Sequence, residues 1–180
     1  RGGDGRLTLK GAIRELLATE FLSALGVATS QTLSIIETEE KLQRNDEPSP
    51  TRSAVLVRRS NGHIRIGTFQ RLAYLNQQDN LEILIDYLRD NYFTHINKSS
   101  NRDLFIEAIF LECVKKIAAS MGKIIISGFV HGVLNTDNFN VTGEVFDFGP
   151  WRFIQYANQN FTAAYFCLLY TSPSPRDLST

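Results

Sequence analysis

The spacing of apolar residues changes along the chain, and the order of these spacings constrains its fold more than any other feature. Helices are expected where apolar residues recur every three or four positions, and strands where short runs are rich in Val, Ile, Leu and Thr. On this basis we predict helices over Leu9–Leu25, Leu81–Phe93 and Arg102–Met121, and strands over Gln31–Glu37, Ser53–Arg58, Ile124–Phe129 and Gly143–Phe148. Helix, strands, helices and then short strands joined by polar loops is an order typical of an α+β chain built in two lobes.

Three further segments lack both patterns. The polar, proline-containing stretch Glu39–Arg52 is predicted to be a mobile loop. His63–Phe69 alternates loosely and is consistent with a strand or with an irregular segment. The Ser- and Pro-containing stretch Thr171–Thr180 has no apolar face, so we expect either a disordered tail or, as the favoured interpretation, a cloning or sequencing artefact.

Composition excludes some classes of protein. The 180 residues carry 19 Lys and Arg against 19 Asp and Glu, so the formal net charge is zero and a broad basic face for nucleic acid is not expected. No apolar run reaches the roughly 18 to 20 residues of a membrane span, so no membrane insertion is expected. Cys113 and Cys167 do not make a disulfide framework, and Cys113 is predicted to be a buried thiol. The three histidines lack the spacing of zinc ligands.

The densest polar cluster runs over His131–Asn138 and is followed by the triplet Asp147-Phe148-Gly149. Magnesium prefers oxygen ligands, and proteins often hold it with a carboxylate together with the phosphates of a nucleotide. Kinase-type sites combine an Asn and an Asp as metal ligands with a second Asp that handles the acceptor hydroxyl. Asn138 and Asp147 are therefore candidate metal ligands that a hairpin would bring together, and Asp137 is a candidate base.

A second interpretation of this cluster stays open. Asn, Asp and Thr dominate turns, so Asn135–Asn140 is also consistent with a simple turn. The spacing departs from that of a kinase as well. A kinase loop places its Asp soon after the His and its Asn several residues later, whereas Asp137 and Asn138 are adjacent.

Two arginines and a glycine-rich start are candidate contacts for phosphate. Arg58 and Arg65 flank a bend at 60–62, and the planar guanidinium group suits phosphate, although ordinary surface pairing is the alternative. Gly3-Asp4-Gly5-Arg6 offers backbone N–H groups to an anion near the start of the first predicted helix.

Glu15 and Glu20 both lie on the first predicted helix. A kinase-like site needs one helical Glu to hold a phosphate-binding Lys. A helical Glu is otherwise usually a solvated surface charge, and the apolar spacing alone does not choose between the two residues.

Taken together, these segments resemble the SelO (selenoprotein O, YdiU) family of protein adenylyltransferases. The matching pieces are Gly3–Arg6, Ile13–Glu15, Leu25–Thr29, Arg58, His63–Phe69, Gly128–Asn138 and Asp147–Pro150. The run from Gly128 to Asn138 is the most specific of them, and the ordered set spans about Arg1 to Phe166.

The resemblance implies a protein-kinase-like (pseudokinase) fold of two lobes that binds ATP in a flipped orientation and transfers AMP to hydroxyl side chains of proteins. Carried over position by position, it implies that Asp137 is the proton acceptor and that Glu15 takes the ion-pair position. The implied magnesium ligands are Asn138 and Asp147, and the implied nucleotide contacts are Asp4, Gly5, Arg58, Arg65 and Asp147.

The chain also departs from the family pattern. The family has a Lys-Gly-Ala-Gly segment upstream of the Gly-Asp-Gly-Arg motif, and the Lys of that segment pairs with the helical Glu. This segment is missing here, and Lys10 lies downstream of the motif and does not stand in for that Lys. We therefore expect an internal fragment, with 1–70 as the remainder of the N-lobe, 71–166 as the C-lobe and 167–180 as a disordered or artefactual tail.

The leading hypothesis is Mg²⁺- and ATP-dependent transfer of AMP to Ser, Thr or Tyr of protein substrates by the full-length parent, with the fragment itself weak or inactive. The alternatives are a kinase-like phosphotransferase and a non-catalytic nucleotide-binding scaffold. By resemblance, a bacterial parent would be cytoplasmic and a eukaryotic one mitochondrial. The sequence does not indicate the protein substrates or the oligomeric state.

Overall fold

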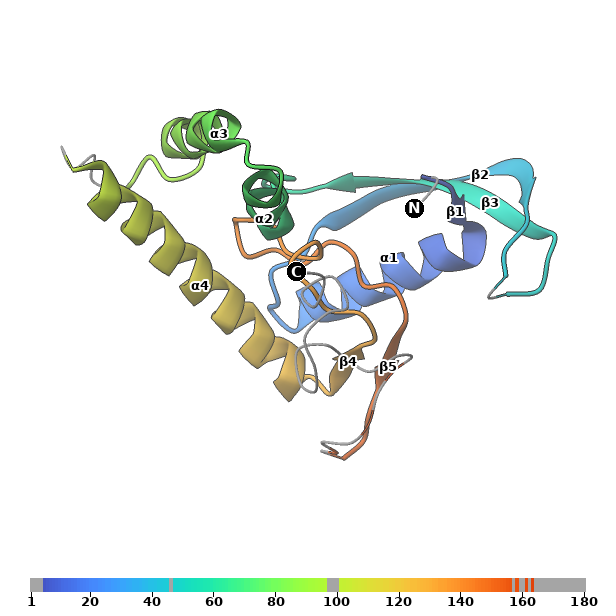
Figure 1. Cartoon of the computed structure of the whole chain (residues 1–180). Helices are drawn as coiled ribbons and strands as arrows, with labels where there is room; N and C mark the ends of the chain where they lie inside the picture. Colours follow the sequence, from blue (N-terminus) through green and yellow to red (C-terminus); the bar gives the residue numbers. More distant parts are fainter. Residues whose placement is uncertain are drawn as a thin grey trace.

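The computed structural model describes residues 5–45, 47–96 and 101–156, together with Asn158, Phe161 and Ala163. The proposed contact Asp4, Cys167 and the tail over 167–180 therefore lie outside the described residues. The elements are β1 (Leu7–Thr8), α1 (Leu9–Ala24), β2 (Gln31–Leu42), β3 (Thr51–Arg59), α2 (Ile66–Tyr74), α3 (Gln78–Asn91), α4 (Arg102–Ile126), β4 (Phe129–His131) and β5 (Trp151–Phe153). Helices and small antiparallel sheets alternate, which confirms the α+β class (Figure 1).

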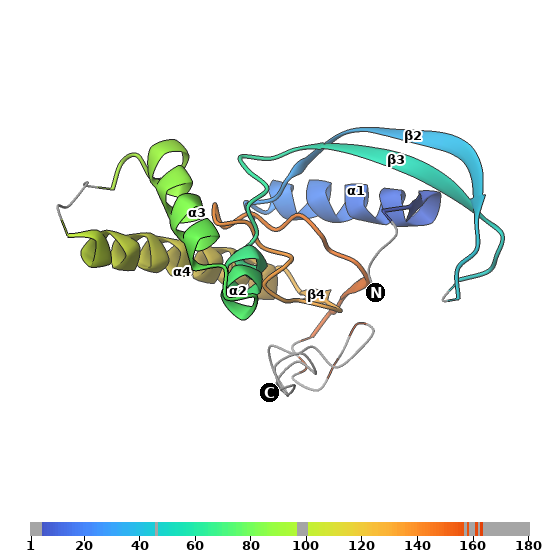
Figure 2. The same ribbon diagram turned by 45° about the horizontal axis from the view of Figure 1, so that its top comes forward.

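Helix α1 packs along one face of an antiparallel sheet of order β1-β3-β2 (Figure 2). Its start is set by Thr8, whose side-chain oxygen accepts a hydrogen bond from the Gly11 N–H at 3.0 Å. It ends before Gly26, which takes the left-handed conformation (φ +76°) that favours glycine. The face of α1 turned toward the molecule buries Ala12, Glu15, Ala18, Thr19 and Leu22.

The hairpin of β2 and β3 is longer than predicted. Pairing continues to Lys41 opposite Arg52 and Leu42 opposite Thr51, past an irregularity after Glu37, so the expected loop over Glu39–Arg52 is wrong at both ends. The polar composition of these residues indicated a loop because most of their side chains face solvent, although Leu42 is buried. The backbone nevertheless pairs, and an ion pair between Arg52 and Glu37 joins the two strands on their exposed face.

Helix α2 begins at Ile66, inside the segment His63–Phe69 for which a strand or an irregular segment was predicted, and only 63–65 stay irregular. The N–H groups of Ile66 and Gly67 donate to Phe139 O and Thr136 O, both at 3.0 Å. Two of the N–H groups that the first turn of a helix leaves without partners are thus bound by a distant part of the chain. No local pattern reports such contacts.

Two other strand predictions were wrong. Helix α4 runs on to Ile126 and takes in the start of the strand expected over Ile124–Phe129, until Gly128 (φ +71°) turns the chain. Gly143–Phe148 forms only isolated bridges through Val145, not a strand. The partner of β4 is instead β5, which is too short to show an apolar pattern.

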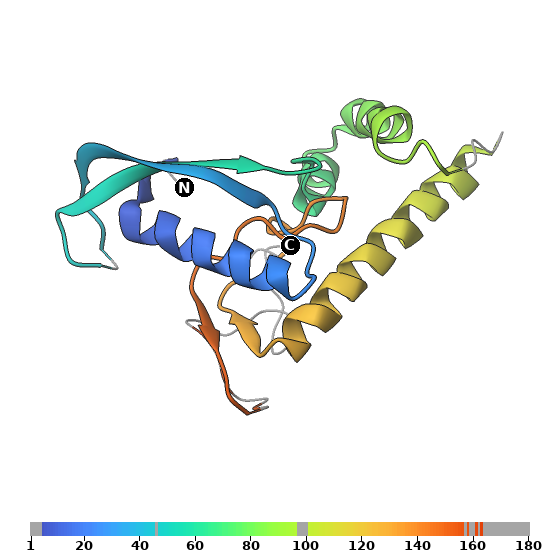
Figure 3. The same cartoon turned by 180° about the vertical axis from the view of Figure 1, so that it is seen from behind.

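The segment that follows β4 is built on two apolar clusters. One cluster joins α1, the end of α4 and the 129–148 segment, and contains Ala18, Leu22, Val27, Ile124, Phe129, Leu134, Phe139, Val145 and Phe148. The other joins α3, α4 and Val141, and contains Cys113, whose thiol pKa burial raises to about 11, as expected for a buried thiol. Figure 3 shows this segment in orange between α1 and the α2–α4 region. Over the described residues, no helix is long and apolar enough to cross a membrane.

Candidate active site

The hairpin expected to join the two candidate metal ligands is present. Phe139 bridges Val145, and the Phe146 N–H donates to Asn138 O at 3.3 Å, so Asn138 and Asp147 lie at the two ends of one turn. Asn138 is buried, and its amide oxygen accepts a hydrogen bond from the Asn135 N–H at 2.9 Å. Asp147 is exposed. The two oxygen groups therefore differ in exposure, since only the Asn138 amide is buried.

Asp137 lies on the other side of this turn, against the start of α2. The Asp137 N–H donates to Asn135 Oδ1 at 2.8 Å. Asn135 therefore binds both Asp137 and Asn138, a role the sequence did not indicate. A methyl group added at Gly67 would lie 2.1 Å from Asp137 Oδ1, so the carboxylate rests against the glycine backbone. The absence of a side chain at Gly67 thus leaves room for the Asp137 carboxylate.

Glu15 connects three parts of the molecule. It is 7% exposed, and its carboxylate accepts hydrogen bonds from Arg58 Nη2 at 2.5 Å, from Phe148 N at 3.1 Å and from Gly149 N at 2.8 Å. Burial raises the pKa of the Glu15 carboxyl above its ordinary value, although the Arg58 charge acts in the opposite direction. Helix α1, strand β3 and the Asp147-Phe148-Gly149 segment therefore meet on one side chain.

The partner of Glu15 differs from the one that the family pattern supplies. The resemblance pairs this Glu with a Lys that is absent here, and within the described part of the chain Arg58 takes that place. The guanidinium group still has other N–H donors, since its Nε is buried without a hydrogen-bond partner. Sequence reasoning named both residues but did not bring them together.

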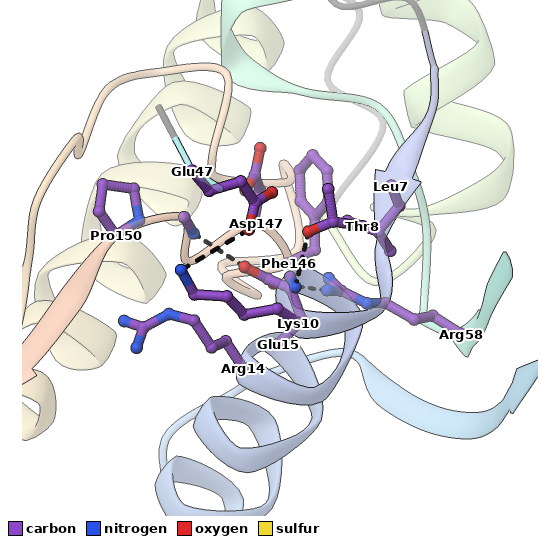
Figure 4. Close-up of a pocket in the computed structure, with 12 residues that line it drawn as sticks. Leu7, Thr8, Lys10, Arg14, Glu15, Glu47, Arg58, Phe146, Asp147 and Pro150 are labelled. Atoms are coloured by element: carbon purple, nitrogen blue, oxygen red, sulfur yellow. Dashed lines mark hydrogen bonds and ion pairs between the residues drawn. The ribbon is translucent and has the colours of Figure 1, made fainter. Parts of the chain in front are cut away.

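A cavity of about 580 Å³ opens between the start of α1, β3 and the 146–150 segment. Glu15, Arg58 and Asp147 line it, with Lys10, Arg14, Glu47, Leu7, Thr8, Gly11, Phe146, Gly149 and Pro150. Figure 4 shows Lys10 reaching across it toward Glu47, with 3.6 Å between Lys10 Nζ and the carboxylate. Both signs of charge thus meet in one cavity.

Not every candidate lies in this cavity. Among the described residues, Gly5, Arg65, Asp137 and Asn138 do not line it. Arg65 lies over the ring of Phe146, with 4.8 Å between Cζ and the ring centroid. Phe146 itself lines the cavity, so Arg65 contacts the side chain of a residue that borders it.

His131 is a site residue that sequence reasoning missed. Its Nδ1 accepts from the Val133 N–H at 3.1 Å, so the neutral ring carries its proton on Nε2 and donates to Asp147 O at 2.8 Å. Burial lowers the pKa of the imidazole. Its spacing from the other histidines gives no sign of this role, whereas its position at the start of the polar cluster does.

Arg14 is the second residue that was missed. Its Nη2 donates to Trp151 O at 2.8 Å, and its guanidinium lies 4.5 Å from the centroid of the Trp151 ring. The adjacent α1 residues Arg14 and Glu15 therefore bind the backbone on the two sides of Pro150.

The side chains of Asn138 and Asp147 fit a magnesium ion that takes its other ligands from water or phosphate better than they fit a metal ion whose ligands all come from the protein. No group of three or more His, Cys, Asp or Glu side chains within the described ranges is arranged to hold a metal ion. One amide and one carboxylate leave most positions to water or phosphate, as Mg²⁺ sites at nucleotides usually do. The amide oxygen of Asn138 keeps a second lone pair beside its bond to Asn135.

Comparison with known proteins points to one family. The family model described as Protein adenylyltransferase SelO matches residues 1–170. The Protein nucleotidyltransferase YdiU of Synechocystis sp. is 49% identical over 166 residues, which are 92% of this chain and 35% of that protein. The proteins of the same name are 51% identical in Trichodesmium erythraeum and 38% in Hahella chejuensis, covering 36% and 31% of those proteins. The chain thus spans about a third of the length of these curated relatives.

Proposed function

The chain belongs to the SelO protein adenylyltransferase family, and on that premise we propose that its parent protein transfers AMP from ATP to Ser, Thr or Tyr hydroxyls of other proteins. The observation that carries this proposal is the Glu15 junction. A buried carboxylate that holds the backbone of Phe148 and Gly149 keeps Asp147 at the edge of a cavity that also contains Arg58.

We propose a kinase-like arrangement in which the β1–β3 sheet and α1 are the remainder of the smaller lobe. The helices from α2 onward and the 129–153 segment then belong to the larger lobe. Residue 70 lies inside α2, so we place the boundary at the 60–65 segment that joins β3 to α2. Glu15 and Arg58 of the smaller lobe and Asp147 of the larger lobe then line one cavity.

In the proposed reaction, the substrate hydroxyl oxygen attacks the α-phosphorus of ATP while the bond from that phosphorus to the bridging oxygen breaks. Pyrophosphate leaves, and the proton of the hydroxyl passes to the Asp137 carboxylate. Arg58 and Arg65 stabilise the phosphate charge, and Asn138 and Asp147 would hold Mg²⁺. The chemistry that Mg²⁺ supplies when bound is charge neutralisation at the phosphate oxygens.

The positioning roles follow from the contacts described above. His131 holds the Asp147 backbone, and Arg14 and Glu15 hold the chain after it. Each fixes a carboxylate whose exposed position leaves it free to meet a ligand. The relatives named above are bacterial, which favours the cytoplasm among the two compartments expected.

Labelled ATP tests the proposal in the full-length protein. Label from the α-phosphate on protein substrates is the expected result, and transfer of γ-label alone would establish the kinase alternative instead. Asp147→Ala separates both enzymes from the scaffold, because only a scaffold keeps its function without that carboxylate. We expect the 180-residue chain alone to turn over far more slowly than the parent, and parent-like rates from the chain would contradict this.

A further inference from the structure

A buried carboxylate outside the proposed catalytic set ties two parts of the site together. Glu144 is 6% exposed and lies in the turn between Asn138 and Asp147. Its Oε2 accepts from Ser60 Oγ at 2.8 Å and from the Asn61 N–H at 3.0 Å, and its Oε1 accepts from Asn61 Nδ2 at 2.8 Å. A buried carboxylate is costly unless its oxygens are bonded, so these contacts hold the 60–62 segment in one place.

The same turn binds that segment at further points. Asn140 Nδ2 donates to Gly62 O at 2.6 Å, the Val141 N–H donates to Ile64 O at 2.9 Å, and the Ile66 N–H donates to Phe139 O at 3.0 Å. The 60–66 connection between β3 and α2 therefore runs alongside the 139–144 turn and is hydrogen-bonded to it at several points. Unlike these contacts, the three that Glu144 makes with Ser60 and Asn61 use a carboxylate.

The bound segment has a defined place in the site. Arg58 lies just before it and Arg65 near its end, while Asn138 and Asp147 lie on either side of the turn that holds it. A shift of the segment would move both arginines relative to both candidate metal ligands. We propose that Glu144 is a positioning residue that sets the distance between the phosphate-binding arginines and the metal ligands, with Asn61 as its partner. This inference rests on the proposed nucleotide site.

Glu144→Gln in the full-length protein tests the inference. Gln keeps the shape of Glu but turns one accepting oxygen into an NH₂ group, which opposes an N–H donor of Asn61 or the Ser60 hydroxyl. We expect the Kd for Mg·ATP, measured by calorimetry, to rise roughly tenfold, the effect of one buried donor left without an acceptor. The KM for ATP should rise by a similar factor while kcat changes less, as for a loss of binding shared by ground and transition states.

Two further variants separate positioning from general stability. Thr142→Val removes the Thr142 hydroxyl, which donates to the same carboxylate at 3.0 Å but does not belong to the 60–66 segment, so ATP affinity should stay unchanged. Asn61→Asp combined with Glu144→Gln exchanges donor and acceptor, and should recover most of the lost affinity. An unchanged Kd in Glu144→Gln, or an equal loss in Thr142→Val, would overturn the inference.

Other outcomes remain informative. If Glu144→Gln does not fold, Asn61→Ala at an exposed position removes one donor to Glu144, and should weaken ATP binding by a factor of roughly three; unchanged affinity there also overturns the inference. A wild-type protein that binds ATP without transferring AMP would refute the proposed function and leave the Kd comparison valid. A wild-type protein that does not bind ATP would refute both.

Discussion

At the scale of single residues, position 67 is a glycine because any side chain there would occupy the space of the Asp137 carboxylate. A methyl group on Gly67 would lie 2.1 Å from Oδ1 and 3.0 Å from Cγ of Asp137. In the full-length protein, we expect Gly67→Ala to fold, since alanine suits a helix, but to displace Asp137 and lower kcat for the proposed AMP transfer by up to about 100-fold. Gly122→Ala in α4 is the matched control, because a methyl group there meets nothing within 4 Å. Equal activity of the two variants would contradict the role given to Gly67.

His131 links the site to pH. Burial lowers the pKa of its imidazole below the ordinary value of 6.5, so the unfolded chain takes up a proton at this residue more readily than the folded protein. The stability that neutral His131 contributes is therefore complete above 6.5 and is lost as pH falls through the lowered pKa. Urea denaturation from about pH 8 to about pH 5 should show the advantage of wild type over His131→Gln shrinking in acid. An advantage that grows in acid would reverse the sign and refute the assignment.

Some of these residue roles follow from sequence and others do not. That one turn carries both Asn138 and Asp147 was predictable because the stretch between them is short and its ends pair locally. The ion pair of Glu15 with Arg58 joins residues 43 positions apart and depends on how α1 lies on β3, which no local pattern reports. Glu144 has the sequence environment of a turn, and only its burial distinguishes it from a solvated carboxylate.

At the scale of elements, α1 acts as a support for the chain after β4. Arg14 contributes both a hydrogen bond to Trp151 O and a contact over the Trp151 ring. We expect Arg14→Met to lower the free energy of unfolding by about 1–3 kcal/mol, since it removes a charged hydrogen bond and a cation–π contact. Arg14→Lys should recover less than half, because an ammonium group does not reproduce the planar fork.

Chemical denaturation measures this difference, and Arg71→Met on the exposed side of α2 is the control. A surface arginine without such contacts should change the free energy of unfolding by less than about 0.5 kcal/mol. Equal losses at Arg14 and Arg71 would show that α1 does not support the segment through Arg14.

The elements also show where the apolar pattern is sufficient. It predicted α1, α3 and α4 because long helices repeat their spacing over several turns. It failed for α2, whose first N–H groups bind Thr136 and Phe139, and for β5, which has three residues. It also misplaced the ends of β2 and β3, because the hairpin there is held by backbone pairing between mostly polar residues that show no apolar alternation.

At the scale of the whole molecule, the cavity contains two ion pairs and one exposed carboxylate, that of Asp147. Glu15 pairs with Arg58, and Lys10 lies 3.6 Å from Glu47, while Asp147 is exposed at the cavity edge. The α1 side of the cavity and the 146–150 side are joined by the backbone bonds of Glu15 and by the packing of Ala18 and Leu22 with Phe148. A ligand that carries both phosphate and a cation would complement this distribution of charge.

This distribution predicts that metal and nucleotide bind as a unit. Two oxygen ligands hold Mg²⁺ weakly because the ion gives up its waters reluctantly, whereas phosphate oxygens complete the set. In the full-length protein we expect Mg²⁺ alone to leave the Tm unchanged, ATP alone to raise it slightly, and the two together to raise it by more than the sum. Asn138→Ala and Asp147→Ala should each abolish the extra rise and keep part of the effect of ATP alone, because they remove metal ligands and leave the arginines. A full rise with Mg²⁺ alone would indicate a preformed metal site, and would place the ligands elsewhere than at this pair.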